Sequence, residues 1–144
     1  MRINVKRIDK NLPLPEYKTK GAVGFDLTAR ENVTLAPFEV TLIPLNLIVE
    51  VPKGFGLFLF SRSSTPSKKG IMVANGVGVI DQDYNGEEDE LKLSAVNITR
   101  KKVLIEKGER ICQGIFLKLS TAKFTEVKKM RSVSRGGFGT TGRR

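Results

Sequence analysis

The sequence predicts an all-β fold, and three observations lead to that prediction. Short runs rich in β-branched and aromatic residues recur along the chain, and several alternate in character as half-buried strands do. Glycine and proline punctuate these runs, as at residues 12–15, 51–54 and 64–70. No convincing amphipathic helix exceeds about a dozen residues, roughly the mean length of a globular helix. Many short strands at close spacing are typical of a sandwich, a jelly roll or a small barrel.

Six segments are predicted to contain strands. In chain order they are INVKRI (3–8), FEVTLIPLNLIVEV (38–51), FGLFLFS (55–61), ELKLSAVNI (90–98), KVLIEKG (102–108) and ICQGIFLKL (111–119). No internal repeat and no linker divides them, and a chain of 144 residues fits one domain. We therefore expect a single domain over residues 1–130.

The last fourteen residues, RSVSRGGFGTTGRR (131–144), follow neither a strand nor a helix pattern. Four glycines and four arginines surround one large aromatic residue, Phe138. Glycine loses the most backbone entropy on folding, and chain ends of this kind are usually disordered. The sequence thus predicts a flexible tail, which is either a solvated end or a flap that becomes ordered on a ligand.

The charge distribution and the residue types narrow the classes of function. The net charge of +10 comes from the two ends of the chain, because residues 21–120 carry twelve basic and twelve acidic side chains. A protein that binds duplex DNA across one face would more often be basic in its body. Basic ends fit phosphate capture by mobile arms, or only solubility. With no histidine and one cysteine, zinc sites and His-based triads are close to excluded.

Cysteine usage and hydropathy indicate the compartment. Cys112 is the only cysteine, which rules out an internal disulfide and suits a reducing cytoplasm. Its apolar neighbours in ERICQGIF (109–116) predict a buried, inert thiol rather than a nucleophile. No apolar run reaches the roughly 18 residues of a membrane span, and the N-terminus lacks the apolar region of a secretory signal. We expect a cytoplasmic protein without a membrane partner.

Two segments in the first half of the chain place polar groups beside apolar runs. In GFDLTA (24–29), Asp26 either caps nearby N–H groups or faces a hydrated divalent ion, and Mg²⁺ suits the second arrangement because it keeps most of its waters. In FSRSSTPSKKG (60–70), an apolar strand ends in Arg62, Ser63 and Ser64. A guanidinium fork and neighbouring hydroxyls suit phosphate oxygens. An ordinary polar turn explains this pattern about equally well.

The segment VANGVGVIDQDYNGEEDE (73–90) offers a candidate general base. Asp81 ends the apolar run VGVI, and Tyr84 follows three residues later, where it can pack against a ligand ring. An acid held against an apolar hairpin suits this role because desolvation raises the pKa of a carboxyl group. Asn85–Gly86 predicts a hairpin turn. The acidic run EEDE (87–90) is predicted to be a solvated edge rather than a metal site.

Gln113 is a polar residue among apolar neighbours in ERICQGIF. In such a strand a glutamine is commonly a satisfied edge residue. Its amide can also orient a water, because it both donates and accepts hydrogen bonds.

Five segments, in order along the chain, resemble the motifs of the trimeric deoxyuridine triphosphatase (dUTPase) family. They are GAVGFDLTA (21–29), SRSS (61–64), NGVGVIDQDYNGE (75–87), KGERICQGIF (107–116) and RGGFGTTG (135–142). One motif alone is weak evidence, but five in order on an all-β chain are highly specific. The resemblance implies a distorted jelly-roll or β-clip-like homotrimer with shared active sites. It also implies hydrolysis of dUTP to dUMP and pyrophosphate with Mg²⁺.

The resemblance implies a role for each candidate residue of the body. Asp81 would activate the water that attacks the α-phosphorus, Gln113 would order the phosphate or the water, and Asp26 would reach magnesium through its waters. The resemblance also implies that Arg62, Ser63 and Ser64 hold the phosphates. Asn75 would bind the uracil together with the backbone of a 77–81 hairpin that contains Gly78, Val79 and Ile80. Tyr84 would lie under the deoxyribose, and Lys92 would lie beside the base.

In the family, the glycine-rich tail crosses to the active site of a neighbouring subunit. The resemblance therefore implies that Phe138 covers the uracil ring and that Arg135, Thr140 and Thr141 contact the terminal phosphates. Glycines such as Gly139 would let the backbone approach the triphosphate. Ordering of the tail would then be coupled to substrate binding. Arg135 lies three residues before the phenylalanine, whereas the commonest family pattern has the arginine five residues before it.

Three alternative functions share some of these features. A dCTP deaminase of similar fold has a related Arg-Ser-Ser motif, but its catalytic glutamate has no clear counterpart here. A bifunctional relative would combine both reactions. A nucleotide-sensing or nucleic-acid-binding module would use the basic ends, and its affinity should fall steeply with salt. The complete motif set favours the triphosphatase, which requires no nucleic acid.

Overall fold

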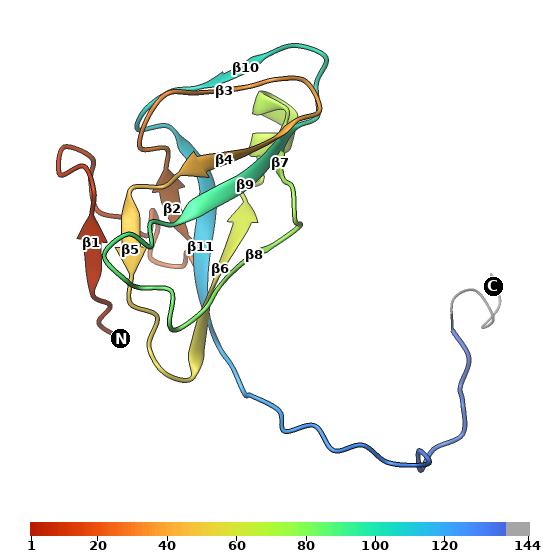
Figure 1. Cartoon of the computed structure of the whole chain (residues 1–144). Coiled ribbons are helices and arrows are strands. Elements are labelled where there is room, and N and C mark those ends of the chain that lie inside the picture. The colour runs from red at the N-terminus through yellow and green to blue at the C-terminus, as the bar shows by residue number, and fades with distance from the viewer. Residues whose placement is uncertain (138–144) are drawn as a thin grey trace.

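The computed structural model describes residues 1–137, which form an all-β body followed by an extended C-terminal arm (Figure 1). The strands are β1 (Val5–Arg7), β2 (Phe25–Thr28), β3 (Val33–Leu35), β4 (Val40–Pro44), β5 (Leu47–Val49), β6 (Phe55–Ser61), β7 (Ile71–Val73), β8 (Gly78–Ile80), β9 (Lys92–Asn97), β10 (Val103–Ile105) and β11 (Arg110–Lys118). The all-β prediction is confirmed. The only helical element among residues 1–137 is the short π-helix η1 (Thr65–Lys69).

The strands pair antiparallel in four small sheets. The largest sheet has the order β2-β11-β6-β8, a second has the order β4-β9-β7, and the pairs β1-β5 and β10-β3 complete the body. In Figure 1, β11 runs through the middle of the molecule between β2 and β6. Because the motif segments 24–29, 60–64, 75–81 and 109–116 lie on or beside the strands of the largest sheet, this sheet positions the candidate site.

Five of the six predicted strand segments each contain one strand, but the prediction for residues 38–51 is wrong as a continuous run. The chain forms β4 and β5 there, and Asn46 lies between them in the left-handed region with a φ of 69°. Asparagine enters this region more readily than most residues. Its side chain is held by the backbone of Asp9, whose N–H donates to Asn46 Oδ1 at 2.6 Å and whose carbonyl accepts from Asn46 Nδ2 at 3.1 Å.

The predicted hairpin turn at Asn85–Gly86 is wrong. β8 pairs with β6, whereas β9 pairs with β4 and β7, so β8 and β9 are not the arms of one hairpin. A two-residue type I′ turn requires positive φ at both central residues, and neither residue has one. The Gly86 N–H instead donates to Asp89 Oδ2 at 2.7 Å within a long loop. The expected hairpin over residues 77–81 is also absent, because residues 78–80 form the single strand β8, which pairs with β6.

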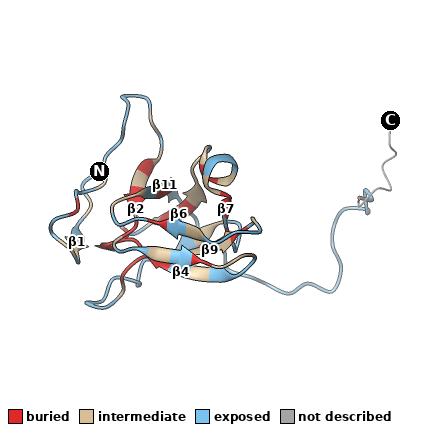
Figure 2. Ribbon diagram, turned by 90° about the horizontal axis from the view of Figure 1, so that it is seen from above, coloured by how far each residue is buried: buried red, intermediate tan, exposed pale blue. Residues whose placement is uncertain are grey.

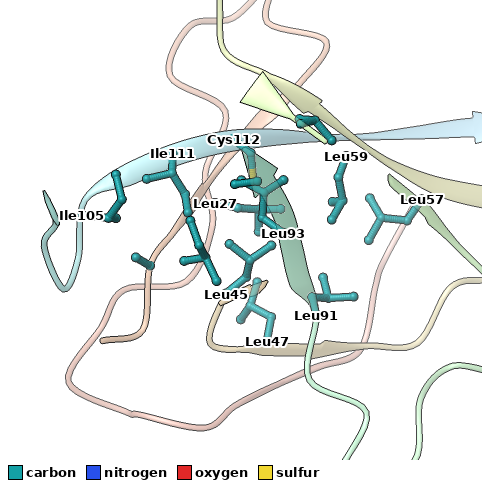
Figure 3. Packing of buried hydrophobic residues seen from close by; sticks show 14 of the residues in the cluster. Leu27, Leu45, Leu47, Leu57, Leu59, Leu91, Leu93, Ile105, Ile111 and Cys112 are labelled. Atoms are coloured by element: carbon teal, nitrogen blue, oxygen red, sulfur yellow. The ribbon is translucent and has the colours of Figure 1, made fainter. Parts of the chain in front are cut away.

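The hydrophobic core lies between the sheets, and leucine is its commonest residue (Figure 3). The residues labelled in Figure 3 are at most 3% exposed, and they are Leu27, Leu45, Leu47, Leu57, Leu59, Leu91, Leu93, Ile105, Ile111 and Cys112. Burying one such aliphatic side chain contributes about 1.5–3 kcal/mol. Figure 2 shows buried residues inside the body and exposed ones along its outer loops and the arm.

Burial raises the pKa of the Cys112 thiol well above its usual range. In the unfolded chain the thiol ionises near pH 8.5, so the folded state loses stability as the pH rises above that value. We expect the free energy of unfolding to fall more steeply above about pH 8.5 in the wild type than in Cys112→Ala, by up to about 1.4 kcal/mol per pH unit. Urea unfolding of both proteins between pH 7 and about 10 measures this. Parallel pH dependences would contradict it.

The arm begins where β11 ends. The Leu119 N–H donates to the Gly54 carbonyl at 2.8 Å, and residues 119–136 are all exposed. Phe124 and Val133 are 93% and 96% exposed, so the arm keeps large apolar side chains in water. The predicted tail residues Phe138, Gly139, Thr140 and Thr141 lie outside the described residues. Over residues 1–137, no helix has the length and apolar character needed to cross a membrane.

Candidate functional site

A carboxylate held between two arginines forms the first part of the candidate site. Asp26 Oδ1 accepts a hydrogen bond from Arg62 Nε at 2.8 Å, and Asp26 Oδ2 accepts one from Arg110 Nη1 at 2.8 Å. Arg62 Nη1 also donates to the Arg110 carbonyl at 3.3 Å. The Asp26 side chain is 15% exposed, while those of Arg62 and Arg110 are 27% and 46% exposed. The carboxylate therefore orients both guanidinium groups and leaves their other donors for an external acceptor.

A β-bulge in β11 brings Arg110 to this face. Arg110 and Cys112 lie opposite adjacent residues of β2, so Ile111 is an extra residue on β11. In a regular strand, residues 110 and 113 would point to opposite faces because side chains alternate. The bulge reverses this alternation, and Arg110 and Gln113 line the same cavity. Arg110 was not among the predicted site residues, and its place in KGERICQGIF was the only signal for it.

An open cavity of about 300 Å³ lies at these side chains, and we call it the arginine cavity. Its lining residues are Lys18, Ala22, Gly24, Asp26, Arg62, Ser63, Arg110 and Gln113. Three basic side chains and one acidic side chain give the wall an excess of positive charge, which favours a multiply charged anion. Lys18 was not among the predicted site residues.

The amide of Gln113 is fixed at the wall of the arginine cavity. Its Nε2 donates to the Ser61 carbonyl at 3.0 Å. A Cβ added to Gly24 would lie 2.8 Å from Gln113 Oε1, so glycine leaves the space that the amide occupies. Ser63 is exposed at the same wall. Ser64 follows it directly at the start of η1 and makes no side-chain capping bond.

The candidate base lies in a second cavity of about 350 Å³, which we call the Asp81 cavity. Its lining residues are Leu42, Val79, Ile80, Asp81, Tyr84 and Lys92. The Tyr84 hydroxyl donates to the Glu90 carbonyl at 3.1 Å, which fixes the ring beside the cavity. The prediction that Asp81 is held against an apolar hairpin is wrong, because Asp81 is exposed in this chain. Another molecule must cover Asp81 if it is to be desolvated.

Gly78 is the first residue of β8 and Asn75 lies in the turn before it, and neither lines the Asp81 cavity. Asn75 is exposed in the preceding turn, where its carbonyl accepts from the Val77 N–H at 2.9 Å. Gly78 faces Leu59 of β6, and an added Cβ would lie 3.0 Å from the Leu59 Cβ. Glycine at position 78 therefore permits close packing of β8 on β6.

The acidic run 87–90 is not a uniformly solvated edge. Glu87 is exposed and forms an ion pair with Lys6, but Glu90 is 8% exposed, so the prediction is wrong for Glu90. The Glu90 carboxylate accepts hydrogen bonds from Arg30 Nε and the Asn46 N–H, which hold it in the interior. Within residues 1–137, no three His, Cys, Asp or Glu side chains gather as metal ligands.

The two cavities lie at different positions along the large sheet and share no lining residue. Ile80, the residue before Asp81, lies opposite Leu57 on β6. Arg62 follows Leu57 by five residues. Five residues of β-strand span about 17 Å. Asp81 and Arg62 of one chain are therefore well separated.

Comparison with protein families and with curated proteins gives one consistent result. A family model described as dUTPase matches residues 10–142. A deoxyuridine 5'-triphosphate nucleotidohydrolase from Finegoldia magna is 41% identical over 145 residues, which cover 97% of this chain and 99% of the relative. The protein of the same name from a Hydrogenobaculum species is 38% identical and covers 99% of each chain.

Solved structures agree with the sequence comparison. A dUTPase from Streptococcus mutans superposes with a TM-score of 0.77 at 35% identity, covering 83% of this chain and 98% of that chain. The dUTPase of Staphylococcus bacteriophage 80alpha, in a structure with dUPNHPP, superposes with a TM-score of 0.86 at 28% identity, covering 98% of each chain.

Proposed function

The chain belongs to the dUTPase family, and from this premise we propose that it hydrolyses dUTP to dUMP and pyrophosphate by attack of water on the α-phosphorus. The observation that carries the proposal is the presence of both an arginine-lined cavity and a cavity that holds Asp81 and Tyr84 in a chain of this family. The reaction keeps uracil out of DNA and supplies dUMP for thymidylate synthesis.

The arginine cavity is suited to the triphosphate. Arg62 and Arg110, oriented by Asp26, offer charged donors to phosphate oxygens, and Lys18 adds a third positive charge. Ser63 and Ser64 add hydroxyl donors, and the Gln113 amide orders a phosphate or the attacking water. In phosphoryl transfer most catalysis comes from positioning and from stabilisation of developing charge. We assign that contribution to this cavity.

The Asp81 cavity is suited to the nucleoside and the attacking water. We assign to Asp81 the removal of a proton from that water, a role that requires an ionised carboxylate within hydrogen-bond reach. Tyr84 packs against the deoxyribose and leaves no room for a 2′-hydroxyl. The uracil edge is read by Asn75 and by the backbone of Gly78, Val79 and Ile80. Lys92 lies at the same cavity.

We propose that each active site combines the arginine cavity of one subunit with the Asp81 cavity of another, in a homotrimer. The proton acceptor must lie beside the α-phosphorus while Arg62 holds the same triphosphate, and about 17 Å of strand separates the two positions within one chain. An apolar face supports association: Val40, Leu42 and Met72 on β4 and β7 are 62%, 58% and 45% exposed and lie on one face of the β4-β9-β7 sheet. Leu42 also lines the Asp81 cavity, which makes that face continuous with the site.

Magnesium fits this arrangement only as an ion carried by the substrate. The described residues offer no cluster of three ligands, and Asp26, the one carboxylate at the arginine cavity, already accepts hydrogen bonds from two arginines. Mg²⁺ commonly keeps several waters and binds substrate phosphates with one or two carboxylates. Asp26 would therefore contact the ion through water, and the ion would supply neutralisation of phosphate charge.

We assign residues 131–144 to a segment that closes over the site, with Phe138 on the uracil and Gly139, Thr140 and Thr141 near the phosphates. Arg135 would contact phosphate despite its shifted spacing. The exposed arm that precedes this segment is compatible with a reach beyond its own body (Figure 1). We also place the enzyme in the cytoplasm, because its only thiol is buried and unpaired.

The direct test is to incubate the protein with dUTP, dCTP, dTTP and UTP, each with Mg²⁺, and to identify the products by chromatography. We expect dUMP and pyrophosphate from dUTP alone. A chain ending at Ser134 should lose about 100-fold in activity because the lid is missing, whereas a chain ending at Gly142 should keep it. Deoxyuridine products from dCTP would assign the chain to the deaminases. No turnover of any nucleotide by folded protein would overturn the proposal.

A further inference from the structure

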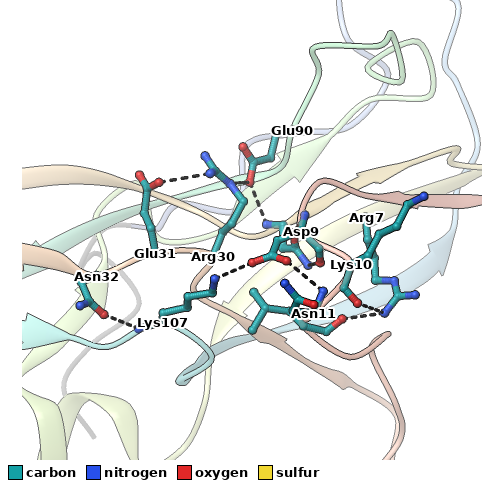
Figure 4. A network of polar contacts seen from close by, with 11 residues as sticks. Arg7, Asp9, Lys10, Asn11, Arg30, Glu31, Asn32, Glu90 and Lys107 are labelled. Carbon is teal, nitrogen blue, oxygen red and sulfur yellow. Dashed lines mark hydrogen bonds and ion pairs between the residues drawn. The ribbon is translucent and has the colours of Figure 1, made fainter.

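The loop that carries Asp81 and Tyr84 ends at a mostly buried charge pair. Glu90 Oε1 accepts hydrogen bonds from Arg30 Nε at 2.8 Å and from the Asn46 N–H at 2.9 Å (Figure 4). The side chain of Glu90 is 10% exposed and that of Arg30 is 28% exposed. A carboxylate buried to this extent stays with its hydrogen-bond partners, because a buried charge without partners would cost several kcal/mol.

The backbone next to Glu90 is fixed by the core. The Leu91 N–H donates to the Leu47 carbonyl at 2.8 Å, and the Leu91 carbonyl accepts from the Leu45 N–H at 2.9 Å. The Leu91 side chain is fully buried. The position of the Glu90 carbonyl is therefore set by its side chain on one side and by the core on the other.

Tyr84 reaches this fixed point from an otherwise exposed loop. Residues 81–88 are all exposed. The bond from the Tyr84 hydroxyl to the Glu90 carbonyl, 3.1 Å long, is the only hydrogen bond that the Tyr84 side chain makes within residues 1–137. The backbone link of Tyr84 to the Asp81 carbonyl is weaker, at 3.4 Å. The Tyr84 ring is thus held against the body chiefly by the hydrogen bond to the Glu90 carbonyl.

We propose that Glu90, clamped by Arg30, is a positioning residue that holds the Tyr84 ring in place and thereby sets the discrimination between deoxyribose and ribose. The proposal rests on the proposed function, in which Tyr84 packs against the sugar. Rejecting a single hydroxyl by shape requires a ring held to within about 0.5 Å, which a side chain on a free loop cannot provide. Glu90 touches no substrate and acts through Tyr84.

The first test compares kcat/KM for dUTP with kcat/KM for UTP in four variants. Glu90→Ala removes the clamp, but it also leaves the buried Asn46 N–H without its acceptor and destabilises the subunit. Tyr84→Phe instead removes the hydrogen bond between the ring and the Glu90 carbonyl, without touching the core. The control is Glu87→Ala, because Glu87 lies in the same loop with its side chain 86% exposed and, among residues 1–137, pairs only with Lys6. The double variant Glu90→Ala with Tyr84→Phe completes a cycle.

We expect Glu90→Ala and Tyr84→Phe each to lower the dUTP-to-UTP ratio by about tenfold, as the loss of one hydrogen bond allows. The double variant should resemble Tyr84→Phe, since the side chain of Glu90 acts on the ring only through the hydrogen bond that Tyr84→Phe removes. Glu87→Ala should keep the wild-type ratio. A wild-type ratio in Tyr84→Phe and in folded Glu90→Ala would overturn the proposal, and so would additive losses in the double variant.

A second test is independent of catalysis. The chain has two tyrosines and no tryptophan, so in a Tyr17→Phe background the tyrosine fluorescence comes from Tyr84 alone. Acrylamide should quench this fluorescence more strongly after Glu90→Ala than after Glu87→Ala. Equal quenching would overturn the tether. If the wild type hydrolyses no nucleotide, the proposed function fails, and this quenching comparison still supports or overturns the tether.

Discussion

Asp81→Asn is expected to lower kcat for dUTP by about 10² to 10⁴-fold, the range that general base catalysis contributes. An amide cannot accept the proton of the attacking water. The Asp81 side chain is exposed and makes no hydrogen bond within residues 1–137, so the substitution should leave folding and substrate binding nearly unchanged. Steady-state kinetics with a binding measurement on a non-hydrolysable dUTP analogue separates the two effects.

Asp83→Asn is the matched control for this change. Asp83 is exposed, lies two residues away and does not line the Asp81 cavity, so the variant should keep wild-type kcat. If Asp81→Asn retained more than about a tenth of wild-type kcat, Asp81 would not be the base, because such a loss is smaller than general base catalysis supplies.

Arg62→Ala is expected to lower kcat/KM for dUTP by about 10² to 10³-fold, as the loss of one preorganised charged donor does in other active sites. The change removes a positive charge from the arginine cavity and one of the two partners that orient Asp26. Arg62→Lys should recover only part of the loss, because a lysine cannot reproduce the planar fork that contacts both Asp26 and the Arg110 carbonyl.

Lys68→Ala provides the control for charge alone. Lys68 is an exposed residue of η1 and lies outside the arginine cavity. If Arg62→Lys had full activity, or if Lys68→Ala lost as much as Arg62→Ala, the effect of Arg62 would be one of general charge rather than of geometry. Initial rates at low dUTP concentration measure kcat/KM for each variant.

The strands that lie in apolar or alternating runs of several residues could be predicted from the sequence. Residues 55–61 form β6 as expected, because a strand buried among other strands reads as a continuous apolar run. β2, β3, β7 and β8, with three or four residues each, were not among the predicted segments, since so short a segment shows little alternation. Asn46 divides residues 38–51 through contacts with Asp9, 37 positions away, which no local pattern encodes.

The same limit applies to the candidate site. Asp26, Arg62, Ser63 and Gln113 were predicted from their motifs, and the sheet brings them to one cavity. Arg110 was missed because a bulge changes the face on which it lies, and a bulge leaves no trace in the alternation of so short a strand. The burial of Glu90 within an acidic run could not be predicted either, because it depends on Arg30, 60 positions away.

The central claim is that one active site takes Arg62 from one subunit and Asp81 from another. The most direct test is to co-express the Asp81→Asn and Arg62→Ala chains with different affinity tags and to assay the mixed oligomer purified on both tags. Each variant alone should be nearly inactive. A trimer that carries both tags contains both kinds of chain, so only one of its three sites combines an intact Arg62 with an intact Asp81, and about a third of the wild-type activity should return. A mixed oligomer as inactive as its parents would show that both residues act within one chain, and would contradict the account.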